Sequence, residues 1–259
     1  MAGSSSFEAK NALIAAGITG PHRSHSREST IRKIHTMIAG EDADASFGLS
    51  GLDKYSAFEV LGFMAELTGC PGDIDDVACG DLIDPDRTMA GLTAAADRLA
   101  EAAARGDSLL VATGHPTGML EFYVRVLDAY VRAGGKTIRL REEEKLAIGT
   151  RGREYEVRYV GGVGCLADWG SLKHTHSSRA MEAMLEVRPW PALVLGDHGF
   201  AGAAIERGIP TIGIMDINDH ALAVAAAEGR DVTIVPLDDN RPPRLYEPAW
   251  SLVEQRLSS

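Results

Sequence analysis

The sequence has few of the cysteines whose disulfides stabilise small exported proteins. It holds three cysteines, Cys70, Cys79 and Cys165, among 259 residues, and none belongs to a C-x-x-C pair. Such a set predicts neither a disulfide framework nor a zinc knuckle. The chain also lacks an apolar run of the roughly 20 residues that a membrane helix needs, and it does not open with a charged and apolar leader. We therefore expect a soluble cytoplasmic protein with no membrane partner.

Positive charge is also scarce. The 26 Lys and Arg residues face 37 Asp and Glu residues, which gives a formal net charge of -11 and a pI near 5.2. A protein that binds nucleic acid without regard to sequence needs a broad cationic face, and this balance offers none. We therefore expect no nucleic-acid partner. The composition leaves open whether the chain forms a homo-oligomer.

The familiar signatures of nucleotide binding and nucleophilic catalysis are missing. The run "GGVG" at 161–164 lacks the third glycine and the helix of a dinucleotide fingerprint, so no nucleotide cofactor is expected. There is no P-loop and no G-x-S-x-G motif. "GDIDDV" at 72–77 resembles the haloacid-dehalogenase motif, but no buried strand precedes it. The nucleophile, a side chain or a water molecule, is not indicated.

Two architectures follow one another along the chain. Residues 1–87 show helical spacing of apolar residues and predict a helical cap or subdomain. Residues 88–259 alternate apolar runs with helical patterns over short connections, which is typical of an α/β domain, and we expect this part to bind phosphate and carry the catalytic residues. The run "YEVRYVGGVGCLAD" predicts an inserted β-hairpin. We expect a three-layer Rossmann-like fold with a mostly parallel sheet.

Polar, chemistry-bearing turns follow the predicted strands on one side only. "TGHPTG", "DHG", "DINDH" and "DDNRPPR" stand at the carboxyl ends, whereas ordinary turns such as "ARGDS" and "ERGIP" stand at the amino ends. Ligands of open α/β sheets bind at the carboxyl ends of the strands. The asymmetry predicts a site at that edge.

The turn "TGHPTG" between the first strand and its helix suits an anion. Glycine permits a tight turn, and the first amides of a helix point outward with the positive end of its dipole. The predicted phosphate-binding residues of this turn are Thr113, Gly114, Thr117 and Gly118. His115 could protonate a leaving alkoxide near neutral pH. The alternative is a helix cap stiffened by proline, with a histidine that only holds the turn.

Carboxylates after the later strands suggest a metal. Asp197 directly follows one strand, and Asp216 and Asn218 follow the next. Oxygen ligands of this kind favour Mg²⁺, so these three residues form the predicted metal site. Asp197 would orient water or metal, and His198 would protonate the leaving oxygen. The alternative is that these residues cap helices, which explains Asp219 better than Asp197.

Three further segments carry cations or hydroxyl groups. His176, Ser178 and Arg179 stand at the start of a predicted helix, and Arg241 follows the last strand; all four are predicted to contact the substrate phosphate. The stretch "PHRSHSREST" at 21–30 is a compact basic patch that either reaches over the site or forms a surface helix start with Ser26 as its N-cap.

Two longer strings carry a family resemblance. "IDPDRTMAGLTAAADRLAEAAARGDSLLVATGHPTGMLEFY" and "GDHGFAGAAIERGIPTIGIMDINDHALAVA" resemble a family of actinobacterial proteins described only as phosphatases, over most of the chain. The resemblance implies a phosphatase-type hydrolase. The plan of helical cap and α/β domain is also similar to DUF89-type metal-dependent phosphatases, whose D-N-x-G-E turn is replaced here by "TGHPTG". That difference shifts the expected metal toward Asp197 and Asp216.

These observations favour a phosphatase that hydrolyses a small phosphorylated metabolite, a sugar-like or nucleotide-like phosphomonoester. The turn at 113–118 would hold the phosphate, with Mg²⁺ or a histidine completing charge neutralisation. Two alternatives use the same anion site. One is a sugar-phosphate isomerase or lyase, and the other is a sensor that binds a phosphorylated metabolite without turnover.

Overall fold

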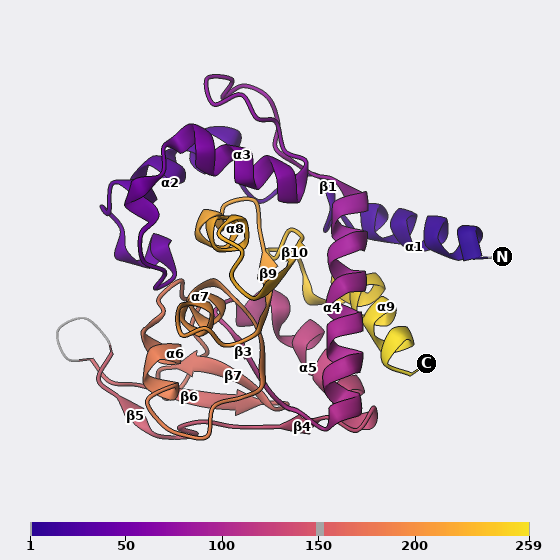
Figure 1. Ribbon diagram of the computed structural model, residues 1–259, viewed down its shortest axis with the longest axis vertical. Coiled ribbons are helices and arrows are strands. Elements are labelled where there is room, and N and C mark those ends of the chain that lie inside the picture. Colours follow the sequence, from indigo (N-terminus) through magenta and orange to yellow (C-terminus); the bar gives the residue numbers. More distant parts are fainter. Residues whose placement is uncertain (1, 149–152, 259) are drawn as a thin grey trace.

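The computed structural model describes residues 2–148 and 153–258, which form an α/β fold (Figure 1). The described helices are α1 (Ala2–Ala16), α2 (Arg27–Ile38), α3 (Ala57–Thr68), α4 (Pro85–Arg105), α5 (Pro116–Arg132), α6 (Arg179–Met184), α7 (His198–Glu206), α8 (His220–Ala227) and α9 (Glu247–Leu257). The described strands are β1 (Gly20–Pro21), β2 (Leu82–Ile83), β3 (Ser108–Thr113), β4 (Lys136–Thr137), β5 (Lys145–Leu146), β6 (Tyr155–Val160), β7 (Val163–Ala167), β8 (Leu193–Asp197), β9 (Thr211–Met215) and β10 (Val232–Pro236).

Eight of these strands form one mixed sheet. Its order is β10-β9-β8-β3-β7-β6-β5, and the short β4 also pairs with β3. β3 is parallel to β8, β4 and β7, and β8, β9 and β10 are parallel to one another. β5, β6 and β7 are antiparallel neighbours. The mostly parallel sheet with an inserted hairpin is therefore confirmed.

The sheet is buried between two helical layers. Every residue of β8 and β9 is buried, as a parallel strand covered on both faces requires. One cluster of buried side chains joins one face of the sheet to α4, α5 and α9, and two further clusters join the other face to α6, α7 and α8. Figure 1 shows these helices on opposite sides of the strands. This burial aligns the carboxyl ends of the parallel strands along one edge.

The N-terminal helices pack on both helical layers. α1 joins the cluster that contains α4 and α9, whereas α2 and α3 pack beside α8. β1 and β2 pair with each other, a two-stranded contact that the helical pattern did not predict. The domain boundary at residue 87 stays a prediction.

A buried ion pair anchors the start of α2. Arg27 Nη1 donates to Asp81 Oδ1 at 2.9 Å, and both side chains are almost fully buried. Ser26 is the N-cap of α2 and accepts from Ser29 N at 3.3 Å. These contacts hold the start of α2 against the chain around Asp81.

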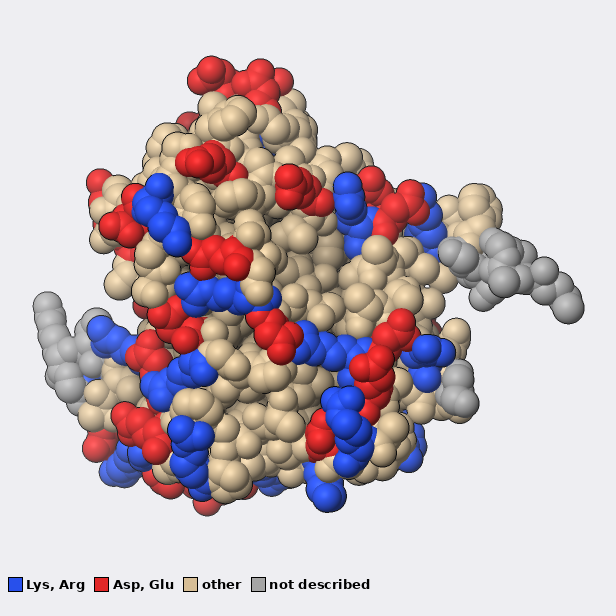
Figure 2. Space-filling view, viewed as in Figure 1, with Lys and Arg blue, Asp and Glu red and all other residues tan. Residues whose placement is uncertain are grey.

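Charge is mixed on the visible surface. On the face in Figure 2, Lys and Arg side chains alternate with Asp and Glu. Within residues 2–148 and 153–258, no helix combines the length and apolar character that a membrane crossing requires.

Candidate active site

Five of the eight histidines in the chain line one small cavity at the carboxyl edge of the sheet. The cavity holds about 120 Å³, whereas roughly 10–15 Å³ of such space admits one water molecule. Its lining consists of His25, Lys33, His115, His174, His176, His198, Asn218, Asp239 and Asn240. These residues come from the N-terminal segment and from the turns after β3, β7, β8, β9 and β10. The polar turns predicted at this edge therefore do meet.

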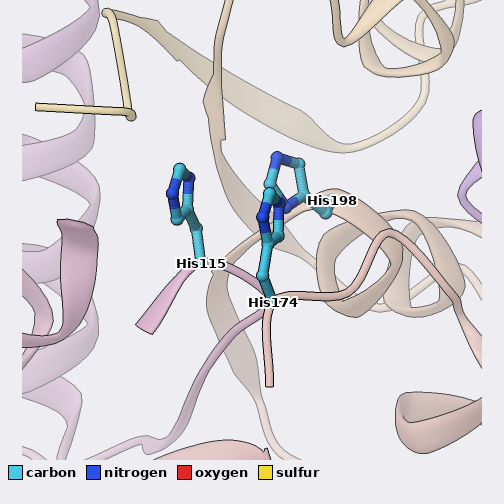
Figure 3. Close-up of side chains that lie close together, drawn as sticks. All are labelled: His115, His174 and His198. Carbon is cyan, nitrogen blue, oxygen red and sulfur yellow. The ribbon is translucent and has the colours of Figure 1, made fainter. Parts of the chain in front are cut away.

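Three of the imidazoles that line this cavity lie close together (Figure 3). His115 precedes α5, His174 lies between β7 and α6, and His198 is the first residue of α7. The rings of His115 and His174 stack with centroids 4.4 Å apart, and that of His198 lies 5.6 Å from His174. One nitrogen from each ring lies within 4.8 Å of the other two. This three-histidine cluster could hold a metal ion.

Orphaned nitrogen atoms support that interpretation. Nδ1 of His115 lies 3.3 Å from Asp239 Oδ1 and Nδ1 of His198 lies 3.7 Å from Asp197 Oδ1, but neither buried nitrogen has a hydrogen-bond partner in the described structure. A buried polar atom is normally satisfied, so each orphan calls for an explanation such as an ion.

His198 is held in a strained backbone conformation. Its φ is +44°, in the left-handed region that side chains with a Cβ avoid. The residue begins α7 directly after β8, and the next position, Gly199, lies so close to Ser177 that a Cβ there would be 2.3 Å from the Ser177 carbonyl carbon. Strain of this kind persists where the surroundings impose it, which occurs often at functional sites.

Two buried carboxylates flank the imidazole of His198. Asp239 Oδ2 lies 3.2 Å from His198 Nε2, and Asp219 Oδ1 lies 3.7 Å from it. Burial alone would lower the pKa of His198, but the two carboxylates outweigh burial and raise it to about 10. Asp239 Oδ1 also lies 3.3 Å from His115 Nδ1. Asp239 is therefore shared between two imidazoles of the cluster.

The pKa values of His174 and His176 shift in the opposite direction. Burial, together with the positive charge of neighbouring histidines, lowers the pKa of His174 to about 4 and that of His176 to about 3. Both rings are thus neutral near pH 7, which is the form that binds a metal ion. Sequence reasoning proposed His176 as a phosphate contact, and the side chain does line the cavity.

Asp197 is fully occupied by donors from the protein. Its carboxylate accepts from Thr113 Oγ1 at 2.6 Å, from Gly114 N at 2.6 Å and from Tyr123 Oη at 3.0 Å. The side chain is completely buried. Asp197 therefore fastens the end of β3 to the end of β8, and its predicted roles as catalyst and metal ligand stay predictions.

The turn at 113–118 uses its polar groups and glycines within the protein. Gly114 N bonds to Asp197, and His115 N bonds to Thr113 Oγ1 at 2.9 Å. A Cβ on Gly114 would lie 2.2 Å from the Thr175 carbonyl oxygen, and one on Gly118 would lie 2.4 Å from that of Asp239. These glycines thus let two neighbouring loops come close to the turn. The backbone amides of Gly114 and His115, in the turn predicted to bind phosphate, are already hydrogen-bonded within the protein.

The remaining predicted anion contacts are scattered. Thr117 is exposed and Ser178 Oγ donates to Glu182 Oε1 at 2.7 Å. Arg179 Nη1 donates to the carbonyl oxygen of Ile148 at 3.0 Å. The Arg241 guanidinium lies against Gly17. None of these four side chains lines the 120 Å³ cavity.

The N-terminal segment reaches the predicted metal residues. His22 Nε2 lies 2.7 Å from Asp216 Oδ1, and His25 Nε2 lies 3.4 Å from Asp216 Oδ2. The carboxamide of Asn218 contacts His25 Nε2 at 3.0 Å, and turned the other way its oxygen accepts from Lys33 Nζ at 2.5 Å. Of the two alternatives for the stretch at 21–30, both hold, because Ser26 caps α2 while His22 and His25 reach the site.

A larger cavity of about 410 Å³ adjoins the first through His174, which lines both. Its walls combine apolar side chains with charged ones from three parts of the chain. They include Asp42, Asp44, Tyr155, Leu166, Lys173 and Arg179. This mixture suits an organic group that carries both apolar and polar atoms.

Lys33, His174, Asp239 and Asn240 line the cavity but were not among the site residues predicted from the sequence. Lys33 lies within a helix with ordinary amphipathic spacing, so its pattern carries no signal of function. Asp239 did carry one, because it follows the last strand of the sheet at the edge where the other polar turns gather.

Comparison with known proteins bears on what this site does. A family model described as Phosphatase matches residues 4–259. The chain belongs to the Phosphatase family. This phosphatase is 38% identical over 232 residues to the protein named Phosphatase SCO2771 from Streptomyces coelicolor (strain ATCC BAA-471 / A3(2) / M145), an alignment that covers 86% of each chain. Membership implies phosphoric monoester hydrolase activity and a phosphorylated substrate, and the resemblance found in the sequence is confirmed.

Proposed function

We propose that the phosphatase hydrolyses a small phosphorylated metabolite with its phosphoryl group in the 120 Å³ cavity over the three-histidine cluster. The observation that carries the proposal is the convergence of five histidines, one lysine and two asparagines on a single cavity. Phosphoryl transfer depends on positioning and on neutralising the charge of the phosphoryl oxygens. This lining supplies donors for both tasks.

The cluster of His115, His174 and His198 is the proposed site of a divalent cation, which would displace the proton that the neighbouring carboxylates hold on His198. Three imidazoles favour a borderline ion such as Zn²⁺, Fe²⁺ or Mn²⁺ over Mg²⁺, which prefers oxygen ligands. A cation bound there supplies positive charge to the phosphoryl oxygens and lowers the pKa of a water molecule. The Mg²⁺ expected from the sequence would need carboxylates instead, and of the three predicted ligands Asp216 belongs to a group of described His and Asp side chains able to hold a metal.

Lys33 and Asn240 are the proposed phosphate contacts. Both line the cavity, and Lys33 carries a positive charge into a site rich in carboxylates. Charge-assisted hydrogen bonds to phosphate are about twice as strong as neutral ones. His25, whose side chain is 25% exposed, stands at the mouth and is the proposed donor of a proton to the leaving oxygen.

The turn at 113–118 has a positioning role in this proposal. Asp197 binds Thr113 and Gly114 and so sets where His115 stands relative to His198. Gly118 lets the chain around Asp239 come close enough to reach both imidazoles. The turn would therefore act on phosphate through the residues that it places.

The 410 Å³ cavity is the proposed place for the organic part of the substrate. Tyr155 and Leu166 offer apolar surface, while Asp42, Lys173 and Arg179 offer partners for hydroxyl or anionic groups. A sugar phosphate or a nucleoside monophosphate carries that combination. Arg179, predicted as a phosphate contact, would bind the leaving group here.

The test measures phosphate release by the full chain with p-nitrophenyl phosphate, sugar phosphates and nucleoside monophosphates. After dialysis against EDTA we expect a loss of activity of at least about 100-fold, recovered on addition of Zn²⁺ or Mn²⁺, because the cation contributes several kcal/mol to the transition state. H174N should behave like the dialysed protein. H35N is the matched control, since His35 is exposed on α2 and lines neither cavity.

Two results would count against this proposal. Release of phosphate from no compound of the panel would reject the hydrolytic function. Full activity after EDTA dialysis, with no metal in the sample, would reject the cation and leave the His198 imidazolium as the source of positive charge.

A further inference from the structure

We propose that His22, Asp216 and Asp238 bind a second divalent cation, which ties the N-terminal segment to the carboxyl edge of the sheet. We call these three residues the His22 cluster. It shares no residue with the three-histidine cluster, and it is a separate group whose ligand atoms all lie within 4.8 Å of one another. The proposal does not depend on the substrate or on the reaction.

The His22 cluster holds an excess of buried negative charge. The side chains of Asp216 and Asp238 are 0% and 2% exposed, and both approach the same imidazole. His22 Nε2 lies 2.7 Å from Asp216 Oδ1 and 3.8 Å from Asp238 Oδ2. One imidazolium can neutralise only one carboxylate, and a buried carboxylate without a counter-charge is strongly unfavourable.

Nearby cationic side chains do not neutralise the second carboxylate. Arg27 is paired with Asp81. Lys33 Nζ lies at the carboxamide of Asn218. His25 Nε2 lies 3.4 Å from Asp216 Oδ2, where the geometry makes no hydrogen bond. A divalent ion would neutralise both carboxylates at once.

Asp216 also offers an oxygen atom that no hydrogen bond uses. Asp216 Oδ1 accepts from His22 and from Ile217 N at 2.7 Å, whereas the buried Oδ2 has no hydrogen-bond partner in the described structure. Asp238 is held by Ser24, whose Oγ donates at 2.7 Å and 2.8 Å to its two oxygens. Support of this kind orients a ligating carboxylate toward an ion.

The separations fit the coordination of a metal ion. Ligand atoms about 2.0–2.2 Å from an ion stand roughly 3–3.6 Å apart at tetrahedral or octahedral angles. The two distances from His22 Nε2, 2.7 Å and 3.8 Å, bracket that range. One imidazole and two carboxylates favour an ion that accepts both nitrogen and oxygen, for which Mn²⁺ is a suitable probe.

Binding requires one change at His22. Its Nδ1 accepts from His25 N at 3.2 Å, which fixes the remaining proton of the neutral ring on Nε2. To ligate an ion through Nε2, the ring must carry that proton on Nδ1 and give up the hydrogen bond from His25. At 3.2 Å this bond is at the long end of the normal range, so its loss is a small opposing effect.

The consequence concerns the segment between β1 and α2. His22 and Ser24 come from that segment, and Asp216 and Asp238 follow β9 and β10. A shared ion would join three distant parts of the chain beside the cavity that Lys33 and His25 also line. The ion would thereby hold the residues proposed to contact phosphate.

The experiment counts metal ions in the full chain. Protein stripped with EDTA is reconstituted with Mn²⁺ alone, freed of unbound ion, and analysed by elemental mass spectrometry, with thermal unfolding measured in parallel. We expect two equivalents in the wild type and one in D238N, which keeps the size of the side chain and its contact with Ser24. H22A should match D238N, and R23A, an exposed neighbour, should keep two.

The count also distinguishes this site from the first. One equivalent in the wild type that is kept in D238N and lost in H174N would overturn the second site and leave the first intact. Two equivalents in D238N would overturn it as well. If H22A does not fold, D238N alone decides, and the gain in Tm on adding Mn²⁺ should be smaller in D238N than in the wild type.

Discussion

Replacing Gly114 by alanine tests how closely two loops must approach to assemble the site. The added Cβ would lie 2.2 Å from the carbonyl oxygen of Thr175 and 3.1 Å from His198 Nδ1. A carbon and a carbonyl oxygen in contact stand roughly 3.3 Å apart, so the chain at Thr175 must retreat by about 1 Å. That retreat strains the hydrogen bond from Thr175 N to Gly114 O, now 2.8 Å long.

The size of the effect follows from these distances. Overpacking costs about 1–3 kcal/mol and the strained hydrogen bond about 1 kcal/mol, so we expect G114A to lose about 2–4 kcal/mol of unfolding free energy. His174 adjoins Thr175 and would move with it. A displacement of about 1 Å in a catalytic group reduces the rate on the order of 100-fold.

The assay combines urea unfolding with kcat/KM for p-nitrophenyl phosphate. The matched control is G62A, because a Cβ on Gly62 of α3 meets no atom within 4 Å and the residue lies inside a helix. That variant should be as active as the wild type and about 1 kcal/mol more stable. Wild-type stability and activity in G114A would refute the argument that the glycine serves loop contact.

Three further predictions address charge. K33M should lower kcat/KM about 10-fold to 100-fold because a charged donor to phosphate is lost, and its circular dichroism spectrum should be unchanged. A kcat/KM equal to that of the wild type would show that Lys33 does not contact phosphate. R27M should cost about 3–5 kcal/mol in urea unfolding because Asp81 is left buried and unpaired, whereas R23M should change stability by less than about 0.5 kcal/mol. Burial and then Lys33 lower the pKa of His220 to about 3, below its unfolded value near 6.5, so its stabilising contribution is complete above pH 6.5 and is lost as the pH falls toward 3. Between pH 7 and pH 5 the wild type should therefore lose about 2 kcal/mol more stability than H220L, and parallel curves for the two proteins would contradict this.

The positions of the buried strands along the chain were accessible from the sequence because burial on both faces leaves continuous apolar runs. β8 and β9 are such runs, and the polar turns that follow them mark the carboxyl edge. The pairing of β1 with β2 was not accessible. Two residues in each strand carry no alternation, and Pro21 and Gly20 suggest a turn rather than a strand.

The location of the site was predictable from the sequence, but the roles of its residues were not. The glycines of the turn at 113–118 were interpreted as part of a phosphate site because a glycine-rich turn before a free helix N-terminus binds phosphate through its backbone amides. Here other loops fill the space, and only tertiary contact reveals that Gly114 faces Thr175 and Gly118 faces Asp239. Likewise, the hydroxyl of Tyr123 reaches Asp197 from a helical position whose pattern indicates only core packing.

The return of the first 33 residues to the sheet edge has a consequence for how the protein can be divided. The α/β part contains all three imidazoles of the three-histidine cluster, yet Lys33, His25 and His22 come from the chain before it. A chain that retained the alternating strands and helices but began after α2 would lose one wall of its cavity, together with the core side chains that α1 and α2 supply. Proteins that share only the later residues could therefore have the same fold and a different site. Residues 21–33 are the part of the chain that distinguishes them.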